Sequence, residues 1–342
     1  MRSTDRKKKK KRTKRIILSI LSFSILGIGI YLAYAFLSAN HFFNSIQGEP
    51  IPSDDANEQV IIENKEPFSI LLLGVDERPG DIGRADTIMV ATINPTSEDI
   101  KLVSIPRDTL VELPDSQEVD KINATYAYGG VPYIIETVEK YLEIPIQYYA
   151  QINFQGMVDL VDTIGGIDVD SPLEFTVQDS TEKADAIHIE KGKQHLNGEE
   201  ALGYARMRKQ DPRGDWGRQE RQRQVIESIV DETISISSLA NFNNIFNAIA
   251  PNLKTNLTGR EIWILGTNYA PAARNIDSLT LDGEADYVYF STYGQEVYVW
   301  VPYEETIEEI QQVLQEHLEM DSTNQNLPLE ENTSSENNGG IE

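Results

Sequence analysis

The sequence contains no cysteine and only four histidines. Without cysteine the chain can form no disulfide, no thiolate zinc site and no cysteine nucleophile. The histidines are scattered without the spacing of metal ligands, and we expect His188 and His195 to lie on the face of a strand. Histidine-based phosphoryl chemistry and zinc hydrolysis are therefore disfavoured.

Three common catalytic motifs are also missing. The chain has no GxxxxGK(S/T) phosphate-binding loop, no GxSxG nucleophile elbow and no HExxH zinc motif. P-loop hydrolysis of nucleotides, serine hydrolysis of the α/β-hydrolase type and zinc proteolysis thus lose their usual sequence signals.

Positive charge is scarce outside the first 15 residues. Ten of the 30 Lys and Arg residues lie at positions 2–15, whereas 54 of the 55 acidic residues follow Arg15, and the net charge is −25. Basic runs also occur in nucleic-acid-binding tails. Because the acidic remainder would repel a polyanion that has no local basic site, we expect no nucleic-acid partner.

Residues 16–39 form an uncharged, apolar run of 24 residues, and about 20 such residues cross a bilayer as a helix. A cleavable signal peptide is the rival interpretation, but its apolar core is usually about 7–15 residues long. The run therefore favours a retained signal anchor. Since positive charge stays on the cytoplasmic side, we expect residues 1–15 inside and the chain from about residue 40 outside, as in a single-pass type II protein of the cell membrane.

The rest of the chain divides by composition. Residues 40–66 are typical of a juxtamembrane spacer, so we expect the folded part to begin near Pro67. Residues 67–235 form the predicted core and 236–319 the C-terminal part of the same extracytoplasmic region, as one main domain with an annex. Residues 320–342 are polar and acidic and predict a disordered tail.

Three short apolar runs at residues 68–75, 87–94 and 100–105 predict strands. The turn NPTSED makes the last two antiparallel. Further patterns predict helices at 131–142, 154–164, 198–208 (capped by Asn197) and 218–234, with strands at 147–152 and 167–169. This alternation indicates an α/β fold in which helices flank a sheet.

Charged residues gather at the predicted strand ends. If the loop after the first strand simply reverses the chain, the segments GVDERPGDIGRADT and SIPRDT meet at one sheet edge, where ligands of α/β sheets bind. This convergence would bring together Asp76, Arg84, Asp86, Arg107 and Asp108.

A third segment, YARMRKQDPRGDWGRQERQRQ, concentrates arginine in an otherwise acidic chain. It supplies Arg206, Arg208, Arg213, Arg218 and Arg221. The planar guanidinium fork matches pairs of phosphate oxygens, so we expect a phosphate-bearing ligand.

We predict that Arg221 and Gln222 of this segment also bind the substrate phosphates. Arg218 and Gln222 should point into the fold, because they share a helix face with the apolar Val225. A buried arginine requires an anion, which could be Asp108, Asp215 or a ligand. A purely structural salt-bridge network is therefore the alternative to phosphate binding.

Two carboxylates beside a phosphate site suit Mg²⁺, which takes a few carboxylates together with water and phosphate oxygens. We predict Asp76 and Asp86 as the metal ligands. The alternatives are a turn-forming role for Asp76 and an ion pair between Asp86 and Arg84. The surrounding arginines favour the metal.

These segments, together with KINATYAYGG and NLKTNLT, resemble the LytR-CpsA-Psr family, strongly over residues 67–235 and more loosely to about 319. The resemblance implies an α/β/α layered fold with a mixed central sheet, behind one transmembrane helix. It implies transfer of an anionic glycopolymer, wall teichoic acid above all, from an undecaprenyl-pyrophosphate carrier in the membrane to the C6 hydroxyl of N-acetylmuramic acid in peptidoglycan.

The resemblance also implies roles for single residues. Asp76 and Asp86 match magnesium-binding aspartates. The matching arginines line the pyrophosphate or its approach; they are Arg84, Arg107, Arg206, Arg208, Arg213 and Arg218. Asp108 could take the acceptor's proton or orient Arg107.

Two other functions use the same site. A pyrophosphatase would hydrolyse the lipid carrier with water in place of the sugar hydroxyl. A non-catalytic wall-binding or regulatory protein would bind the ligand without magnesium-dependent turnover.

Overall fold

The structure is a computed structural model that describes residues 46–51, 58–76, 83–181, 183–235, 245, 247–290 and 292–320. The predicted cytoplasmic segment (1–15), membrane anchor (16–39) and nearly all of the predicted tail (321–342) lie outside the described residues. Within those ranges, no helix has both the length and the apolar character needed to span a bilayer.

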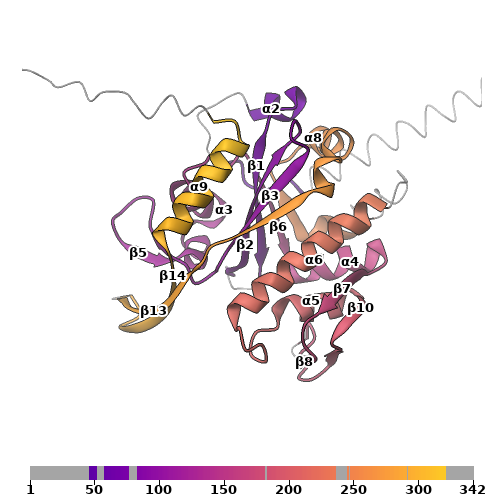
Figure 1. Cartoon of the computed structure of the whole chain (residues 1–342), viewed down its shortest axis with the longest axis vertical. Coiled ribbons are helices and arrows are strands. Elements are labelled where there is room, and N and C mark those ends of the chain that lie inside the picture. The colour runs from indigo at the N-terminus through magenta and orange to yellow at the C-terminus, as the bar shows by residue number, and fades with distance from the viewer. Residues whose placement is uncertain are drawn as a thin grey trace, which may run out of the picture.

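A mixed sheet of six strands forms the centre of the molecule (Figure 1), in the order β11-β6-β1-β2-β3-β12. β1 pairs antiparallel with β2 and β2 with β3, whereas β6 runs parallel to β1 and β12 runs parallel to β3. The strands are β1 (Phe68–Val75), β2 (Ala85–Asn94), β3 (Asp99–Ile105), β6 (Tyr148–Asn153), β11 (Leu253–Thr255) and β12 (Ile276–Thr280). The prediction of three strands with two reversals is confirmed, as is the mixed sheet.

Alternation along β1 assigns its side chains to the two faces of the sheet. Leu71 and Leu73 pack against helices α3 (Ile122–Leu142) and α9 (Glu304–His317). Phe68 packs on the opposite face, where α2 (Glu58–Asn64) and α8 (Gly259–Ile264) lie. Helices on both faces give the expected layered α/β arrangement.

A second core lies beside the sheet and is built from three helices and four short strands. The helices are α4 (Phe154–Ile164), α5 (Gly198–Arg206) and α6 (Asp215–Ser235). The strands form two pairs, namely β7 (Ile167–Ser171) with β10 (Gly192–Leu196) and β8 (Phe175–Val177) with β9 (Ile187–Ile189). His188 lies in β9 and His195 in β10, as predicted.

Two further hairpins complete the described part. β4 (Leu110–Glu112) pairs with β5 (Val119–Lys121) directly after β3. β13 (Gly283–Phe290) pairs with β14 (Gln295–Pro302), and this hairpin projects from the body of the molecule (Figure 1). The sequence patterns had not resolved either hairpin.

Helix α3 begins nine residues before the predicted start at 131. Its first part is hidden from pattern analysis because Gly129 and Gly130 leave helical geometry, with φ +67° at Gly130, and Pro132 follows. The glycines kink the element, so its two parts follow different directions.

Helix α5 ends at Arg206 instead of Arg208, because Met207 leaves the helical conformation with ψ 130°. The predicted cap is present, since the Asn197 side chain accepts from the Glu200 N–H in a capping box. The early end releases Arg208 from the helix.

The folded part begins before Pro67, which corrects the spacer prediction for residues 40–66. Ile46 and Ile62 are fully buried, and Gly48 N–H donates to the Thr255 carbonyl at 2.9 Å. The segment is mostly polar, which is why it resembles a spacer. Burial of these two apolar side chains nevertheless stabilises its contact with the core.

The boundary drawn at residue 235 also does not separate an annex. β11 and β12, both C-terminal to it, form the two edges of the central sheet. Long-range pairing of this kind has no local sequence signal.

Candidate functional site

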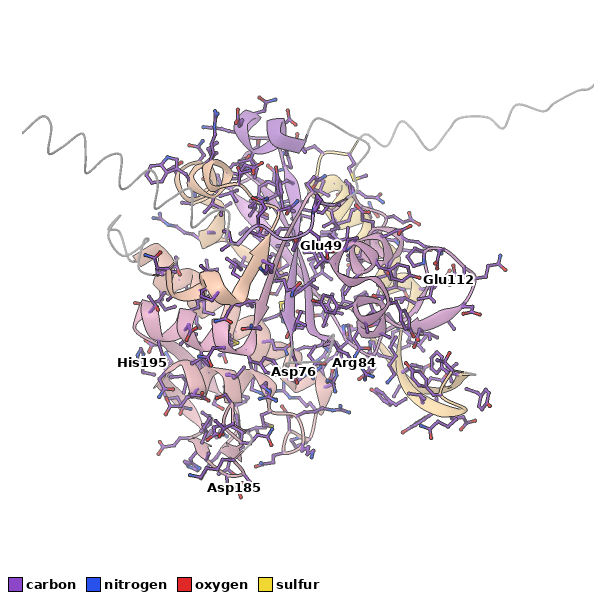
Figure 2. The ribbon with its side chains drawn as sticks, turned by 180° about the vertical axis from the view of Figure 1, so that it is seen from behind. Glu49, Asp76, Arg84, Glu112, Asp185 and His195 are labelled. Atoms are coloured by element: carbon purple, nitrogen blue, oxygen red, sulfur yellow. The ribbon has the colours of Figure 1, made fainter. Side chains whose placement is uncertain are left out.

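One cavity of about 730 Å³ lies at the edge where β1 ends, β2 begins and β3 ends. The five residues predicted to converge there all line it; they are Asp76, Arg84, Asp86, Arg107 and Asp108. Figure 2 labels Asp76 and Arg84 together at the end of the central strands. The antiparallel reversals therefore do bring these segments to one edge of the sheet.

The turn between β1 and β2 holds its two ends close together. Asp76 N–H donates to the Arg84 carbonyl at 3.3 Å, and the pairing register shifts between Gly74 and Val75. Gly83 takes φ +77°, which a residue with a side chain rarely adopts, and it lines the cavity. The chain thus re-enters β2 with Asp86 beside Asp76.

Arg107 is the centre of the ionic contacts at this edge. Its Nη1 lies 2.7 Å from Asp86 Oδ1, and its Nε lies 3.7 Å from Asp108 Oδ2. Burial alone would lower the pKa of Arg107, but Asp86, Asp108 and Asp215 outweigh burial and raise it. Asp86 therefore pairs with Arg107, and not with Arg84 as the structural alternative had it.

Asp108 connects this cluster to the β4–β5 hairpin. Lys121 Nζ donates to Asp108 Oδ1 at 2.8 Å, and Asp108 itself is 8% exposed. Two cations therefore contact one nearly buried carboxylate, which fixes the orientation of Arg107.

The first turn of α6 adds Arg218, which is 5% exposed and pairs with Asp215 at 2.8 Å. Burial lowers the pKa of Arg218, and repulsion from Arg107 and Arg208 lowers it further, while Asp215 and Asp86 act against this shift. These mutual effects show that the three arginines share one electrostatic environment.

Two guanidinium nitrogens at this point have no hydrogen-bond acceptor among the described residues. The Nε atoms of Arg107 and Arg218 are buried, and neither makes a hydrogen bond to any described residue. A buried donor without an acceptor costs about 1–3 kcal/mol, more for a charged group. An anionic ligand between the arginines would satisfy both nitrogens.

A second cavity of about 470 Å³ adjoins the first and shares Asp86, Arg107 and Arg208 with it. Arg206, Arg218 and Gln222 complete its polar side, and the Arg206 guanidinium lies 4.3 Å from the centre of the Phe154 ring. Apolar residues also line this cavity, among them Ile152, Met157, Leu202 and Met207. Arg107 and Arg208 thus line both the first cavity and the second, which has polar and apolar lining residues.

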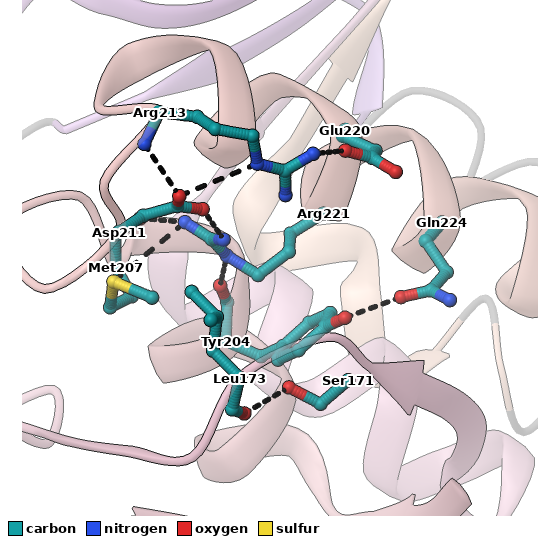
Figure 3. Close-up of polar contacts among 9 residues, drawn as sticks. All are labelled: Ser171, Leu173, Tyr204, Met207, Asp211, Arg213, Glu220, Arg221 and Gln224. Atoms are coloured by element: carbon teal, nitrogen blue, oxygen red, sulfur yellow. Dashed lines mark hydrogen bonds and ion pairs between the residues drawn. The ribbon is translucent and has the colours of Figure 1, made fainter. Parts of the chain in front are cut away.

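Arg213 and Arg221 were also predicted to contact the substrate, but neither lines either cavity. Arg221 is 1% exposed, and its Nη1 lies 2.5 Å from Asp211 Oδ2 (Figure 3). Arg213 lies on the other side of the same aspartate and also pairs with Glu220. These two arginines hold the loop before α6 together.

Close packing against Asp211 explains one glycine of the DPRGDWG string, and a positive φ explains another. A Cβ at Gly217 would meet Asp211 Oδ2 at 1.8 Å, and Gly214 takes φ +60°. The loop therefore bends sharply around Asp211 before α6 begins. This bend places Arg208 and Arg218 on the side of the cavities.

Among the described residues, Asp76 and Asp86 are the predicted metal ligands at this edge, and both are carboxylates. No group of three or more His, Asp or Glu among the described residues is arranged to hold a metal ion. Asp76 and Asp86 line the same cavity, and one or two carboxylates are what Mg²⁺ commonly takes when substrate phosphates supply further oxygens. The residues present thus fit Mg²⁺ that arrives with a phosphate-bearing substrate.

Sequence reasoning missed a group of cavity-lining residues. Lys121, Asn123, Tyr293, Gln295 and Tyr298 complete the wall of the first cavity. The first two lie in the KINATYAYGG segment, which was singled out only as a whole. The alternating tyrosines of β13 and β14 were a strand signal that would have indicated the hairpin.

Comparison with known proteins agrees with this geometry. The sequence matches the LytR_cpsA_psr family over residues 34–316. It is 43% identical over 270 residues to the polyisoprenyl-teichoic acid–peptidoglycan teichoic acid transferase TagU of Bacillus cereus (strain AH820), covering 78% of this chain and 86% of that protein. It is 40% identical over 315 residues to TagU of Bacillus subtilis (strain 168), covering 92% and 99%.

Solved structures show the same fold. The crystal structure of B. subtilis TagV superposes with a TM-score of 0.66 at 38% identity, covering 75% of this chain and 98% of that one. A structure of TagT bound to LI-WTA gives a TM-score of 0.62 at 31% identity, covering 75% and 92%. With the family match extending over most of its length, the chain belongs to the LytR_cpsA_psr family.

Proposed function

We propose that this protein transfers an anionic cell-wall glycopolymer of the teichoic acid class from an undecaprenyl-pyrophosphate carrier to the C6 hydroxyl of N-acetylmuramic acid in peptidoglycan. The names of its relatives support a transferase of this kind. The observation that carries the proposal is the pair of buried Nε donors of Arg107 and Arg218, which make no hydrogen bond to any described residue and lie beside two carboxylates.

In this proposal the arginines bind the diphosphate. Arg107 and Arg218 donate from inside the fold, and Arg208, whose side chain is 43% exposed, closes the site from the cavity they share. Guanidinium groups fixed by burial need little reorganisation when charge develops on the phosphates. Arg84 and Arg206 extend the positive surface along the two cavities.

Asp76 and Asp86 would hold Mg²⁺, with substrate oxygens completing its coordination. When bound, the ion supplies charge neutralisation at the diphosphate. Asp86 also contacts Arg107, so the same carboxylate would orient one cation and ligate another.

The chemical step replaces the phosphoanhydride bond of the donor with a phosphoester bond to the acceptor. The acceptor hydroxyl oxygen forms a bond to the phosphorus on the polymer side, the bond from that phosphorus to the bridging oxygen breaks, and polyprenyl phosphate leaves. The hydroxyl proton passes to a base or to solvent. Positioning and charge stabilisation supply most of the rate in such transfers.

We assign Asp108 a positioning role in preference to that of proton acceptor. Its two oxygens already contact Lys121 at 2.8 Å and Arg107 at 3.7 Å. Because both oxygens are occupied by these contacts, the carboxylate is well placed to fix the guanidinium plane. The variant Asp108→Asn should reduce the transfer rate without abolishing its dependence on pH.

The direct test is transfer from a synthetic lipid-pyrophosphate donor to peptidoglycan oligomers. Asp76→Ala and Arg107→Ala should each lose most of the activity, whereas Arg260→Ala should keep it, because that side chain is 74% exposed on α8. Full activity in both site variants would refute the assignment.

Product analysis separates the remaining alternatives. A pyrophosphatase would release free polymer phosphate at the same rate with and without peptidoglycan. A non-catalytic binding protein would retain the donor unchanged when Mg²⁺ is present. Only a transferase would attach the polymer covalently to the acceptor.

We further propose that residues 16–39 anchor the protein in the cell membrane and that the described domain lies outside it. Both substrates, a membrane-bound donor and a wall acceptor, are compatible with that position. Protease added to intact cells without their wall should digest the described domain and leave a membrane-bound N-terminal fragment. Full protection of the domain would contradict this topology.

A further inference from the structure

The β13–β14 hairpin carries a row of aromatic side chains on one face. Residues paired across antiparallel strands share a face, and Tyr287 pairs with Tyr298 while Tyr289 and Trp300 lie two residues farther along their strands. Tyr287, Tyr289, Tyr298 and Trp300 thus form one strip, which we call the aromatic strip. The opposite face carries the fully buried Val299, and its Gln295 and Val297 line the first cavity.

The aromatic strip starts at the catalytic edge. The Trp300 ring lies 6.1 Å from that of Trp216, two residues before Arg218, and Trp300 N–H donates to the Asp108 carbonyl at 2.8 Å. Tyr298 lines the first cavity and lies 5.9 Å from Lys121 Nζ. Inner members of the strip are therefore tied to the arginine and aspartate cluster.

The outer members lead away from the cavity. The Tyr287 ring meets Tyr298 edge to face at 6.0 Å, and Tyr287 and Tyr289 are each 64% exposed. Figure 1 shows the hairpin projecting beyond the body of the molecule. Large aromatic side chains left in water on a projecting element mark an interaction surface.

The charge of the hairpin decides which substrate it fits. On the face of the strip the paired strands carry Glu296 and no Lys or Arg, and Glu284 and Asp286 add negative charge on the other face, so a polyanion would be repelled. The second cavity, in contrast, carries Arg206, Arg208, Lys209 and Arg218. An anionic polymer therefore fits the side of the second cavity, and an uncharged partner fits the hairpin.

We propose that the aromatic strip binds the uncharged glycan strand of the acceptor and leads one of its sugar hydroxyls into the first cavity. This inference rests on the proposed transferase function. The apolar faces of amino sugars stack on flat rings, while a tyrosine hydroxyl can hydrogen-bond with sugar hydroxyls and amides. Side chains two residues apart on a strand lie roughly 7 Å from each other, so successive rings can contact successive sugars of an extended chain.

Glycan binding can be measured without any donor. The full-length chain in detergent micelles is titrated with N-acetylated chitohexaose, a neutral chain of N-acetylglucosamine, by calorimetry. Tyr287→Ala with Tyr289→Ala should raise Kd roughly tenfold, because two stacking faces are lost. The matched pair Tyr287→Phe and Tyr289→Phe keeps the rings and should stay within about threefold of wild type.

Trp263→Ala is the control for losing an exposed aromatic ring elsewhere. This side chain is 58% exposed on α8, which lies at the other end of the molecule from the hairpin (Figure 1). The control should not change Kd for chitohexaose. A Kd unaffected by the double alanine change, or the absence of chitohexaose binding by wild type, would overturn the proposal.

A second probe, poly(glycerol phosphate), tests the assignment of the two sides. Its binding should be insensitive to the tyrosine changes and weakened by Arg218→Ala. If the tyrosine changes weaken the polyanion and not chitohexaose, the strip serves the donor and the proposal fails. Because neither titration involves turnover, a failure of the transfer assay would leave these results interpretable.

Discussion

Arg218 and Arg221 lie one turn apart on α6, and both are buried, yet their surroundings differ. Arg221 is saturated: it pairs with Asp211, donates to the Tyr204 and Met207 carbonyls, and lies against two aromatic rings. Arg218 has Asp215 as its ion-pair partner, keeps a buried Nε without a hydrogen bond to any described residue, and is lowered in pKa by burial and by neighbouring arginines. A buried arginine whose donors all have acceptors stabilises the fold. A buried arginine that lies beside other cations and keeps a donor without a described acceptor is suited to bind an anion.

The largest effect should come from Arg221→Met. This change leaves Asp211 buried without its main partner, which we expect to lower the free energy of unfolding by about 3–5 kcal/mol. Urea unfolding followed by circular dichroism measures it. Adding Asp211→Leu should restore part of the loss, because the buried charge is removed as well. Equal unfolding midpoints for wild type and Arg221→Met would break the comparison.

Arg218→Ala should act on activity instead. We expect kcat/KM for transfer to fall by about 10²–10³, the effect of removing one fixed donor from a developing charge. Stability should change much less than in Arg221→Met, because the change also relieves repulsion with Arg107 and Arg208. Arg218→Lys keeps the positive charge but loses the planar guanidinium group with its paired donors, so partial activity is expected. An unfolded Arg218→Ala protein would show that this residue, too, is structural.

The pH dependence of stability should follow Asp211. Burial alone would raise its pKa, but contacts with Arg221 and Arg213 lower it below the usual value of about 3.9. A carboxylate with a lowered pKa contributes stability above its usual pKa, and this contribution is lost as the pH falls toward the lowered value. The stability advantage of wild type over Arg221→Met/Asp211→Leu should therefore shrink from about pH 5 to about pH 3. A constant difference across that range would argue against the pair as its source.

The smallest effect is expected for Arg213→Ala. Its side chain is 42% exposed and lines neither cavity, so the ion pairs with Asp211 and Glu220 should contribute less than about 1 kcal/mol. Transfer activity should stay near the wild-type value in the same assay. A tenfold loss of kcat/KM would return Arg213 to the substrate site, where the sequence alone had placed it.

The site edge was predictable because its information is local. Strand ends, turn residues and the reversal at NPTSED predict that Asp76, Asp86 and Arg107 lie together, and all three line the first cavity. The same holds for the cap at Asn197, whose side chain accepts the expected backbone hydrogen bond. These features depend on neighbours within a few residues.

Which arginines line the cavities and which stabilise the loop before α6 was not predictable in this way. Arg213, Arg218 and Arg221 share one motif, and only the fold around Asp211 determines which of them faces the cavities. The edge strands β11 and β12 depend on pairing over long sequence distances, which local patterns do not encode. The same reason explains why the burial of Ile46 was missed.

The central claim is that Arg218 binds the pyrophosphate of the substrate, whereas the arginines that contact Asp211 do not bind it. A binding measurement tests this claim most directly. The measurement is Kd of the full-length chain for geranylgeranyl pyrophosphate in the presence of Mg²⁺, with Arg218→Ala and Arg213→Ala compared with wild type. We predict that Arg218→Ala weakens binding at least roughly tenfold, since a charge-assisted hydrogen bond is lost, and that Arg213→Ala leaves Kd unchanged. Equal affinities for wild type and Arg218→Ala, or an equal loss in both variants, would contradict the account.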